Sequence, residues 1–355
     1  MISSNPLLGA ALHAIGAICA ALCYTPQKKT KRWSWQTYWL AQASVCWLAL
    51  PVIGAWLTVP ELVTVLAESA REPMLKSFLL GALYGVGGTA FGVAIRYLGF
   101  SLTYAIAIGI SCVLGTLLPP FLSGQLAVIF GKTGADWVLI GVAIAAIGIL
   151  ASGLAGWLKD SDLRAASASP GEFALTKGLF YCVLAGVLSA VFGLSLAAGQ
   201  PVADVAARHG AGQFEGNVIY IFACSGAFVT TAIYSLFLHF RHRTLGEYVE
   251  LPAGEEKAAL PLNFSMAVLT GMLWYGQFFF YGIGHVRMGA YKFTSWAIHM
   301  AMLVLFSTLA GVVLREWKGC RSRTWTALAA AVVILLAAVM ALTYGNYLGS
   351  APSAH

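Results

Sequence analysis

The hydrophobic positions of this chain fall into ten long runs separated by short polar segments. Each run is continuously apolar instead of alternating with period two, which favours α-helices over the strands of a membrane barrel. A hydrocarbon core about 30 Å thick needs about 20 apolar residues per helix, and each run has about that length. The runs cover residues 6–24, 36–59, 74–95, 102–122, 136–157, 173–198, 217–240, 262–283, 291–313 and 325–347. The pattern predicts an all-α membrane protein with ten transmembrane helices.

Composition agrees with this prediction. Hydrophobic residues make up 59% of the 355 positions and charged residues only 10%, against about 25% charged in a typical soluble domain. The first run has no basic residue before it and is followed by Lys28, Lys29, Lys31 and Arg32. That order predicts an uncleaved first helix instead of a secretory signal.

The basic residues are distributed unevenly between the two sides of the predicted bundle. The side of the Lys28 loop carries 15 of the 21 Lys and Arg residues. By the positive-inside rule this side is cytoplasmic, so both termini are predicted to be periplasmic. The same bias explains the net charge of +7, and we expect no nucleic-acid partner, because such a partner needs a dense basic patch on a polar surface.

A polar segment divides the ten runs into two sets of five. It covers residues 159–172 and contains Ser167, Pro170 and Gly171. We therefore predict a first five-helix repeat over 1–158, a cytoplasmic linker over 159–172 and a second repeat over 173–355. Because five is odd, two such repeats must insert in opposite senses, which is the inverted-repeat plan of many secondary transporters.

The small and sulfur-containing residues of the runs indicate packing. Gly81, Gly85, Gly88 and Gly92 form a stripe of small residues that favours close helix contact. Six of the seven cysteines lie within runs, where a thiol behaves as a small apolar residue, and no Cys-x-x-Cys pair is present. We expect no metal site and no cofactor.

The most polar membrane segments are the eighth and ninth runs. Trp274, Gln277, Tyr281 and His285 recur at helical spacing, so one face of the eighth helix presents them together. An indole can cover the apolar face of a sugar while an amide and a phenol bond its hydroxyl groups, so we expect Trp274, Gln277 and Tyr281 to bind a sugar. The alternative is that these side chains fill a packed helix bundle.

A second stripe in the ninth run consists of Lys292, Ser295, Trp296 and His299. Ser295 and Trp296 are further candidates for substrate binding. Lys292 lies near the predicted end of the helix, where snorkelling to the interface is the alternative explanation.

Proton coupling needs a group that changes charge near neutral pH, and histidine has a suitable intrinsic pKa of about 6.5. No Asp or Glu lies in the middle of any run. The candidates are therefore His13, His285 and His299, together with Lys292. His13 shares a helix face with the small residues Gly9, Gly16 and Ala20, so a neighbouring helix can approach it closely.

Three stretches of the chain stand out by their composition: Lys28-Lys29-Thr30-Lys31-Arg32-Trp33-Ser34-Trp35, Arg96-Tyr97-Leu98-Gly99, and the segment from Trp274 to His285 together with Ser295, Trp296 and His299. In these stretches the chain resembles the L-rhamnose-proton symporter family within the drug/metabolite transporter superfamily. The resemblance implies a multi-pass protein of the bacterial inner membrane. It also implies import of L-rhamnose or a related 6-deoxyhexose with protons by alternating access.

Other functions remain open at this point. The resemblance implies an acidic residue in the ninth helix where this chain has Lys292, so an uncoupled sugar facilitator or a metabolite exporter of the same superfamily is the alternative. An intramembrane enzyme typically needs clustered carboxylates, and here the acids lie in loops, so we predict no enzyme and no catalytic residue. The carried sugar, the proton stoichiometry and the oligomeric state are left open.

Overall fold

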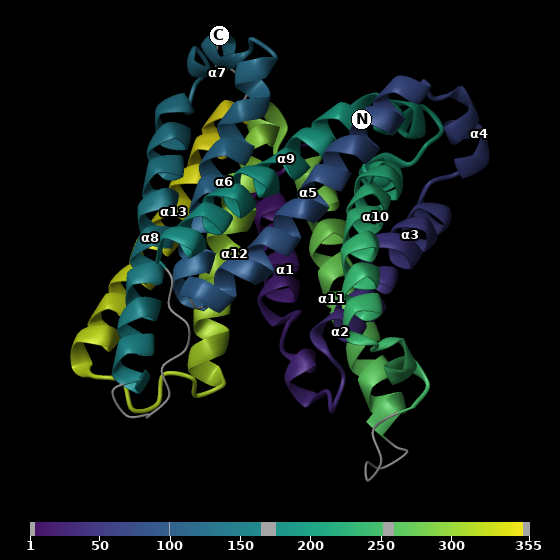
Figure 1. Cartoon of the computed structure of the whole chain (residues 1–355). Coiled ribbons are helices and arrows are strands. Elements are labelled where there is room, and N and C mark those ends of the chain that lie inside the picture. Colours follow the sequence, from purple (N-terminus) through teal and green to yellow (C-terminus); the bar gives the residue numbers. More distant parts are fainter. Residues whose placement is uncertain (1–3, 99, 165–174, 251–258, 351–355) are drawn as a thin grey trace. The chain divides into compact units, whose positions relative to one another are not determined.

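The computed structural model describes residues 4–98, 100–164, 175–250 and 259–350. The regular structure in these ranges is helical throughout, and no strand occurs in them (Figure 1). The elements are α1 (Pro6–Leu22), η1 (Pro26–Lys29), α2 (Trp35–Ala43), η2 (Ser44–Ala49), α3 (Leu50–Thr58), α4 (Leu62–Glu68), α5 (Arg71–Leu98), α6 (Phe100–Leu122), α7 (Leu126–Phe130), α8 (Ala135–Arg164), α9 (Leu175–Arg208), η3 (Gly212–Phe214), α10 (Asn217–His242), η4 (Leu245–Tyr248), α11 (Ala259–His285), η5 (Gly289–Thr294), α12 (Ser295–Val313) and α13 (Ser322–Ser350).

The predicted all-α membrane class is confirmed. Nine helices in the described ranges are long and apolar enough to cross a membrane, and large apolar side chains such as Leu57, Phe180 and Val333 are exposed on them. An apolar surface of this extent requires lipid around it. The eighth predicted run corresponds to α11, which is not among the nine. Its amides, hydroxyls and aromatic residues lower its hydropathy, so the tenth span stays a prediction.

The second predicted run is not a regular α-helix throughout. The run consists of α2, the π-helix η2 and α3 in direct succession. The Leu50 N–H donates to the Val45 carbonyl, five residues back. Pro51 comes next and has no N–H to donate, so the preceding turn loses an α-helical hydrogen bond there. Such π segments are frequent at functional sites.

The described residues pack into two compact units. Unit 1 comprises Met1–Ala21, Gly87–Leu194 and Phe280–His355, and unit 2 comprises Leu22–Val86 and Ser195–Phe279. Each unit draws on segments from both sides of the predicted linker, of which residues 165–172 lie outside the described ranges. The predicted boundaries at 158 and 173 separate two repeats along the sequence. The two units are defined by packing instead, so the predicted repeats stay a prediction.

In unit 1, α8 lies along α13, and α6 packs on both α8 and α12. A Cβ on Gly148 would lie 2.8 Å from the Leu335 side chain, so the small residue permits the close approach of α8 and α13. Asp162 near the end of α8 accepts hydrogen bonds from the Thr324 hydroxyl at 2.6 Å and the Arg321 N–H at 3.0 Å. The bond from Arg321 satisfies a backbone N–H at the start of α13, and both bonds tie this end of α13 to α8.

In unit 2, α10 packs against α2, η2 and α3. A Cβ on Gly81 would collide with the Ala223 carbonyl, and one on Gly85 with Ala227 and Thr230. The predicted role of the glycine stripe in close packing is confirmed for these two residues. Glu247 fixes the loop before α2, because its Oε2 accepts hydrogen bonds from the Ser34 N–H and the Ser34 and Thr37 hydroxyls.

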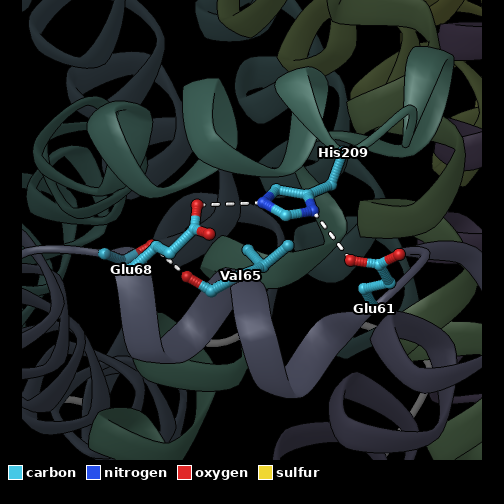
Figure 2. A network of polar contacts seen from close by, with 5 residues as sticks. Glu61, Val65, Glu68 and His209 are labelled. Atoms are coloured by element: carbon cyan, nitrogen blue, oxygen red, sulfur yellow. Dashed lines mark hydrogen bonds and ion pairs between the residues drawn. The ribbon is translucent and has the colours of Figure 1, made fainter.

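An imidazole between two carboxylates joins α4 to the end of α9 in unit 2. Figure 2 shows His209 between Glu61 and Glu68, with Val65 on the intervening turns of α4. The His209 Nδ1 lies 3.2 Å from the Glu61 Oε2, and its Nε2 lies 2.9 Å from the Glu68 Oε2. A neutral imidazole has only one N–H, so two carboxylate acceptors favour the protonated ring.

Candidate functional site

Tyr281 is the centre of a cluster of aromatic rings in unit 1. It belongs to the last turns of α11, and its ring lies 5.1 Å from that of His13 and 5.5 Å from that of His299, centroid to centroid. The Trp296 ring is 5.8 Å away and nearly perpendicular, and the His285 ring is stacked at 5.8 Å. We call these five residues the Tyr281 cluster. The structure thus brings together all three predicted membrane histidines.

His13 and His299 are the most deeply buried members of the cluster, with exposed fractions of 0% and 1%. None of their four ring nitrogens has a hydrogen-bond partner of good geometry. Buried polar groups normally have a hydrogen-bond partner, so two buried imidazoles without one need an explanation such as a functional ligand. Protons are the smallest ligand that an imidazole can take.

Small residues let α1 approach the end of α11 at this point. A Cβ on Gly9 would lie 2.6 Å from the Met288 Sδ and 3.1 Å from the Gly284 carbonyl. A Cβ on Gly284 would lie 3.2 Å from the His13 ring. The sequence prediction that small neighbours allow close helix approach around His13 is therefore confirmed for Gly9.

Two other members of the cluster, His285 and Trp296, have hydrogen-bond partners. His285 Nδ1 lies 3.1 Å from the Ser295 hydroxyl, which is completely buried. The Trp296 indole donates to the Ser111 carbonyl at 3.0 Å. Trp296 can therefore offer its ring face to a ligand, while its N–H is already engaged.

Lys292 lies outside α12, the helix that carries the rest of its predicted stripe. It belongs to η5, which precedes α12, and it is exposed. Only Ser295, Trp296 and His299 of that stripe lie on α12. Exposure is what snorkelling predicts for a lysine at the interface.

Trp274 and Gln277 belong to unit 2, although they share α11 with Tyr281. The Gln277 side chain is 5% exposed. The Trp274 indole N–H is buried without a hydrogen-bond partner. Its ring meets that of Trp47 edge to face, at 5.5 Å between centroids and 85° between planes.

Sequence reasoning missed Trp47 of η2, Gln42 of α2 and Ser111 of α6. Gln42 is a mid-run amide, and such residues are costly in a membrane, so its position in the second run was a usable indication. Trp47 lies in an apolar run where an aromatic residue is ordinary. Only the structure reveals its contact with Trp274.

A separate cavity of about 90 Å³ lies in unit 1 and is lined by Tyr104, Ser152, Lys159, Glu316 and Trp317, among others. The Lys159 Nζ lies 3.9 Å from the Glu316 Oε2 and 5.0 Å from the centre of the Trp317 ring. The cavity lining includes no member of the Tyr281 cluster. In the part of the chain that the structure covers, no group of three or more His, Cys, Asp or Glu residues is arranged to hold a metal ion.

Comparison with known proteins gives consistent matches along the chain. The family described as L-rhamnose-proton symport protein matches residues 2–346. The chain is 36% identical over 348 residues to a protein of Pectobacterium atrosepticum named L-rhamnose-proton symporter, covering 96% of this chain and 98% of that one. It is 34% identical over 339 residues to a protein of the same name from Cronobacter sakazakii, covering 95% and 97%. A Yersinia pestis protein of that name is 34% identical over 336 residues, covering 94% and 96%.

Proposed function

Because the chain belongs to the L-rhamnose-proton symport family, we propose that it imports L-rhamnose or a related 6-deoxyhexose together with protons. The family is one of transporters, so no chemical step is assigned to the chain. The observation that carries the proposal at the level of residues is the Tyr281 cluster, in which buried histidines without hydrogen-bond partners lie against aromatic rings. It unites a group able to take a proton with surfaces suited to a sugar.

The sugar is a neutral polyol, so its recognition requires hydrogen-bonding groups and aromatic faces more than fixed charges. We assign sugar contacts to Trp274, Gln277, Tyr281, Ser295 and Trp296. Trp274 is favoured because its buried N–H lacks an acceptor in the protein. Trp296 would contribute its ring only, since its N–H already donates to Ser111.

Protons are assigned to His13 and His299, with His285 and Lys292 as further candidates. Coupled transport requires that protonation favour one conformation over the other, because a ligand shifts an equilibrium only through differential affinity. No ring nitrogen of these two buried imidazoles has a hydrogen-bond partner of good geometry. A proton arriving on either ring therefore changes the charge of the site without first breaking a bond. His285 is tied to Ser295, and Lys292 is exposed.

We further infer ten transmembrane helices arranged as two inverted repeats that work by alternating access. Helices five spans apart pack on each other within a unit: α8 with α13 and α6 with α12 in unit 1, and α10 with α2 and α3 in unit 2. Pairing of corresponding elements is the arrangement expected of a pseudo-twofold repeat. With the Lys28 loop in the cytoplasm, both termini lie in the periplasm.

Transport by the purified protein tests this function. The protein is reconstituted in vesicles, and uptake of labelled L-rhamnose and its stereoisomers is measured with and without an imposed pH gradient. Accumulation above the outside concentration that requires the inward proton gradient supports symport. Uptake that only equilibrates the sugar, with no response to the pH gradient, would instead support an uncoupled facilitator. That alternative was raised by Lys292, which stands where the resemblance implies an acidic residue. Absence of both uptake and binding of L-rhamnose would contradict the proposed function.

A further inference from the structure

Three buried nitrogen donors in unit 2 lack a hydrogen-bond acceptor. They are the Gln42 Nε2, the Trp47 Nε1 and the Trp274 Nε1. Gln42 is 0% exposed and Trp47 is 2% exposed. Buried donors are nearly always paired, since leaving one unpaired loses its bonds to water without replacement. Three such donors on two helices that touch each other therefore indicate a ligand that brings acceptors.

The π-helix η2 positions two of these donors. In a straight α-helix, residues five apart such as Gln42 and Trp47 would point about 140° away from each other, at 3.6 residues per turn. The wider π turn, marked by the Leu50 N–H donating to the Val45 carbonyl, reduces this angle. The Gln42 amide is oriented by its Oε1, which accepts a hydrogen bond from the Cys46 thiol at 3.5 Å. Its Nε2 is left to donate elsewhere.

Contacts with α11 bring the third donor to the same place. A Cβ on Gly271 would lie 2.6 Å from the Val45 side chain and 3.2 Å from the Gln42 carbonyl, so α11 touches this part of the helix at Gly271. One turn further along α11, the Trp274 ring meets the Trp47 ring edge to face. The Trp47 ring also meets that of Tyr84 at 6.1 Å. The three donors thus belong to one contact region between two helices, lined by aromatic rings.

We propose that Gln42 and Trp47 bind the sugar together with Trp274, each donating to a hydroxyl oxygen of the substrate. This inference rests on the proposed transport function and adds two residues that determine specificity. The three groups are neutral donors on or beside aromatic rings, a combination that suits the hydroxyl oxygens and the apolar face of a 6-deoxyhexose. Hydroxyl-specific donors also explain how stereoisomers would be distinguished, because a sugar lacking the matching oxygen leaves a buried donor unpaired.

The test is a comparison of sugar analogues on purified protein. Affinities of wild type, Gln42→Met and Trp47→Phe are measured for L-rhamnose and for its 2-deoxy, 3-deoxy and 4-deoxy analogues. Each variant should bind L-rhamnose about three- to tenfold more weakly, the effect of one lost hydrogen bond. Each should also lose the preference of the wild type for L-rhamnose over the one analogue that lacks its partner hydroxyl. A purely structural role would lower affinity for all four sugars alike.

Gln36→Met is the matched control, because Gln36 is a buried amide of the same helix whose Nε2 already donates to the Thr244 hydroxyl. It should leave the order of the four affinities unchanged. A second measurement uses the ¹⁵N-labelled wild type, so it does not depend on the folding of a Gln42 variant. The indole N–H resonances of Trp47 and Trp274 are assigned by substituting each residue with Phe. Both resonances should shift when L-rhamnose is added.

The outcomes separate the two proposals. If the wild type binds L-rhamnose but both variants keep its affinities for all four sugars, or both indole resonances stay unmoved, the assignment of Gln42 and Trp47 is wrong and the transport function stands. If the wild type neither binds nor transports L-rhamnose, the proposed function and this inference are both wrong.

Discussion

The rings of His13 on α1 and His299 on α12 lie 6.1 Å apart, centroid to centroid, and meet edge to face in unit 1. Both are buried, and Tyr281 contacts both. Two positive charges at this separation repel strongly where water is excluded. The pair is therefore suited to holding one proton at a time.

We expect His299→Gln to abolish concentrative uptake driven by a pH gradient while sugar binding and exchange persist. Glutamine keeps hydrogen-bonding capacity but does not titrate near neutrality. Uptake and exchange in vesicles measure the two activities separately. His242→Gln, at an exposed histidine of α10, is the control and should transport as the wild type does. Wild-type accumulation by His299→Gln would transfer the coupling role to His13 or His285.

Replacing His13 with Leu should abolish coupling and raise thermal stability. Both nitrogens of His13 are buried without partners, and an unpaired buried polar group costs about 1–3 kcal/mol. A side chain of similar volume without polar atoms removes that cost, so the apparent melting temperature in detergent should increase. A decrease would mean that the ring has partners that stabilise the native state.

How far the sequence predicts the site differs between residues. The Tyr281 cluster combines groups whose polarity in apolar runs was visible in the sequence, and helical spacing correctly placed Tyr281 beside His285. The contact of His13 with Tyr281 and His299 joins α1, α11 and α12, and spacing along one helix carries no information about such contacts. The same holds for the Ser111 carbonyl that engages Trp296.

The runs themselves were predicted well because apolar length is a strong and local property. The π segment was missed, since its cause is a single proline within an otherwise regular apolar run. The sequence prediction placed Lys292 on the α12 stripe because it extended the α-helical spacing backwards past Ser295. The helix begins at Ser295, and the preceding 3-10 turn has a different period.

Gly115→Ala should destabilise the protein by about 1–3 kcal/mol, the usual cost of overpacking. A Cβ at this position would collide with the Trp296 indole nitrogen and move it from the Ser111 carbonyl. Gly109→Ala is a control on the same helix, since its Cβ would meet only the Ile149 side chain at 3.7 Å. Thermal unfolding of the purified variants measures both. Equal stability of the two would show that Trp296 moves aside without cost.

The stability of unit 2 should depend on pH through His209. The hydrogen bond to Glu68, followed by the charge of Glu68 and the contacts with Glu61, raises the pKa of His209 above its usual value of 6.5. A raised pKa stabilises the native state at pH below the unfolded value, and this contribution is lost as the pH rises through the folded pKa. The melting temperature of wild type relative to His209→Gln should therefore fall as the pH rises above about 6.5. A difference that does not change with pH above this value would contradict a raised pKa of His209.

The orientation of the chain can be read from Cys320. It is partly exposed in the connection between α12 and α13, beside Lys318, Arg321 and Arg323, and basic connections are predicted to be cytoplasmic. In a variant that keeps only this cysteine, an impermeant thiol reagent should label inverted vesicles but not intact cells.

Burial raises the pKa of the Cys320 thiol, and only the thiolate reacts, so the labelling is done at mildly alkaline pH and followed over time. The matched control is Lys132→Cys in a background without other cysteines, at an exposed position between α7 and α8. It is predicted to lie on the periplasmic side and should react in intact cells. Because the predicted ten spans put the two positions on opposite sides in either orientation, reaction of Cys320 in intact cells together with protection of the cysteine at 132 would reverse the predicted orientation. Reaction of both from the same side would instead contradict the number of spans between them.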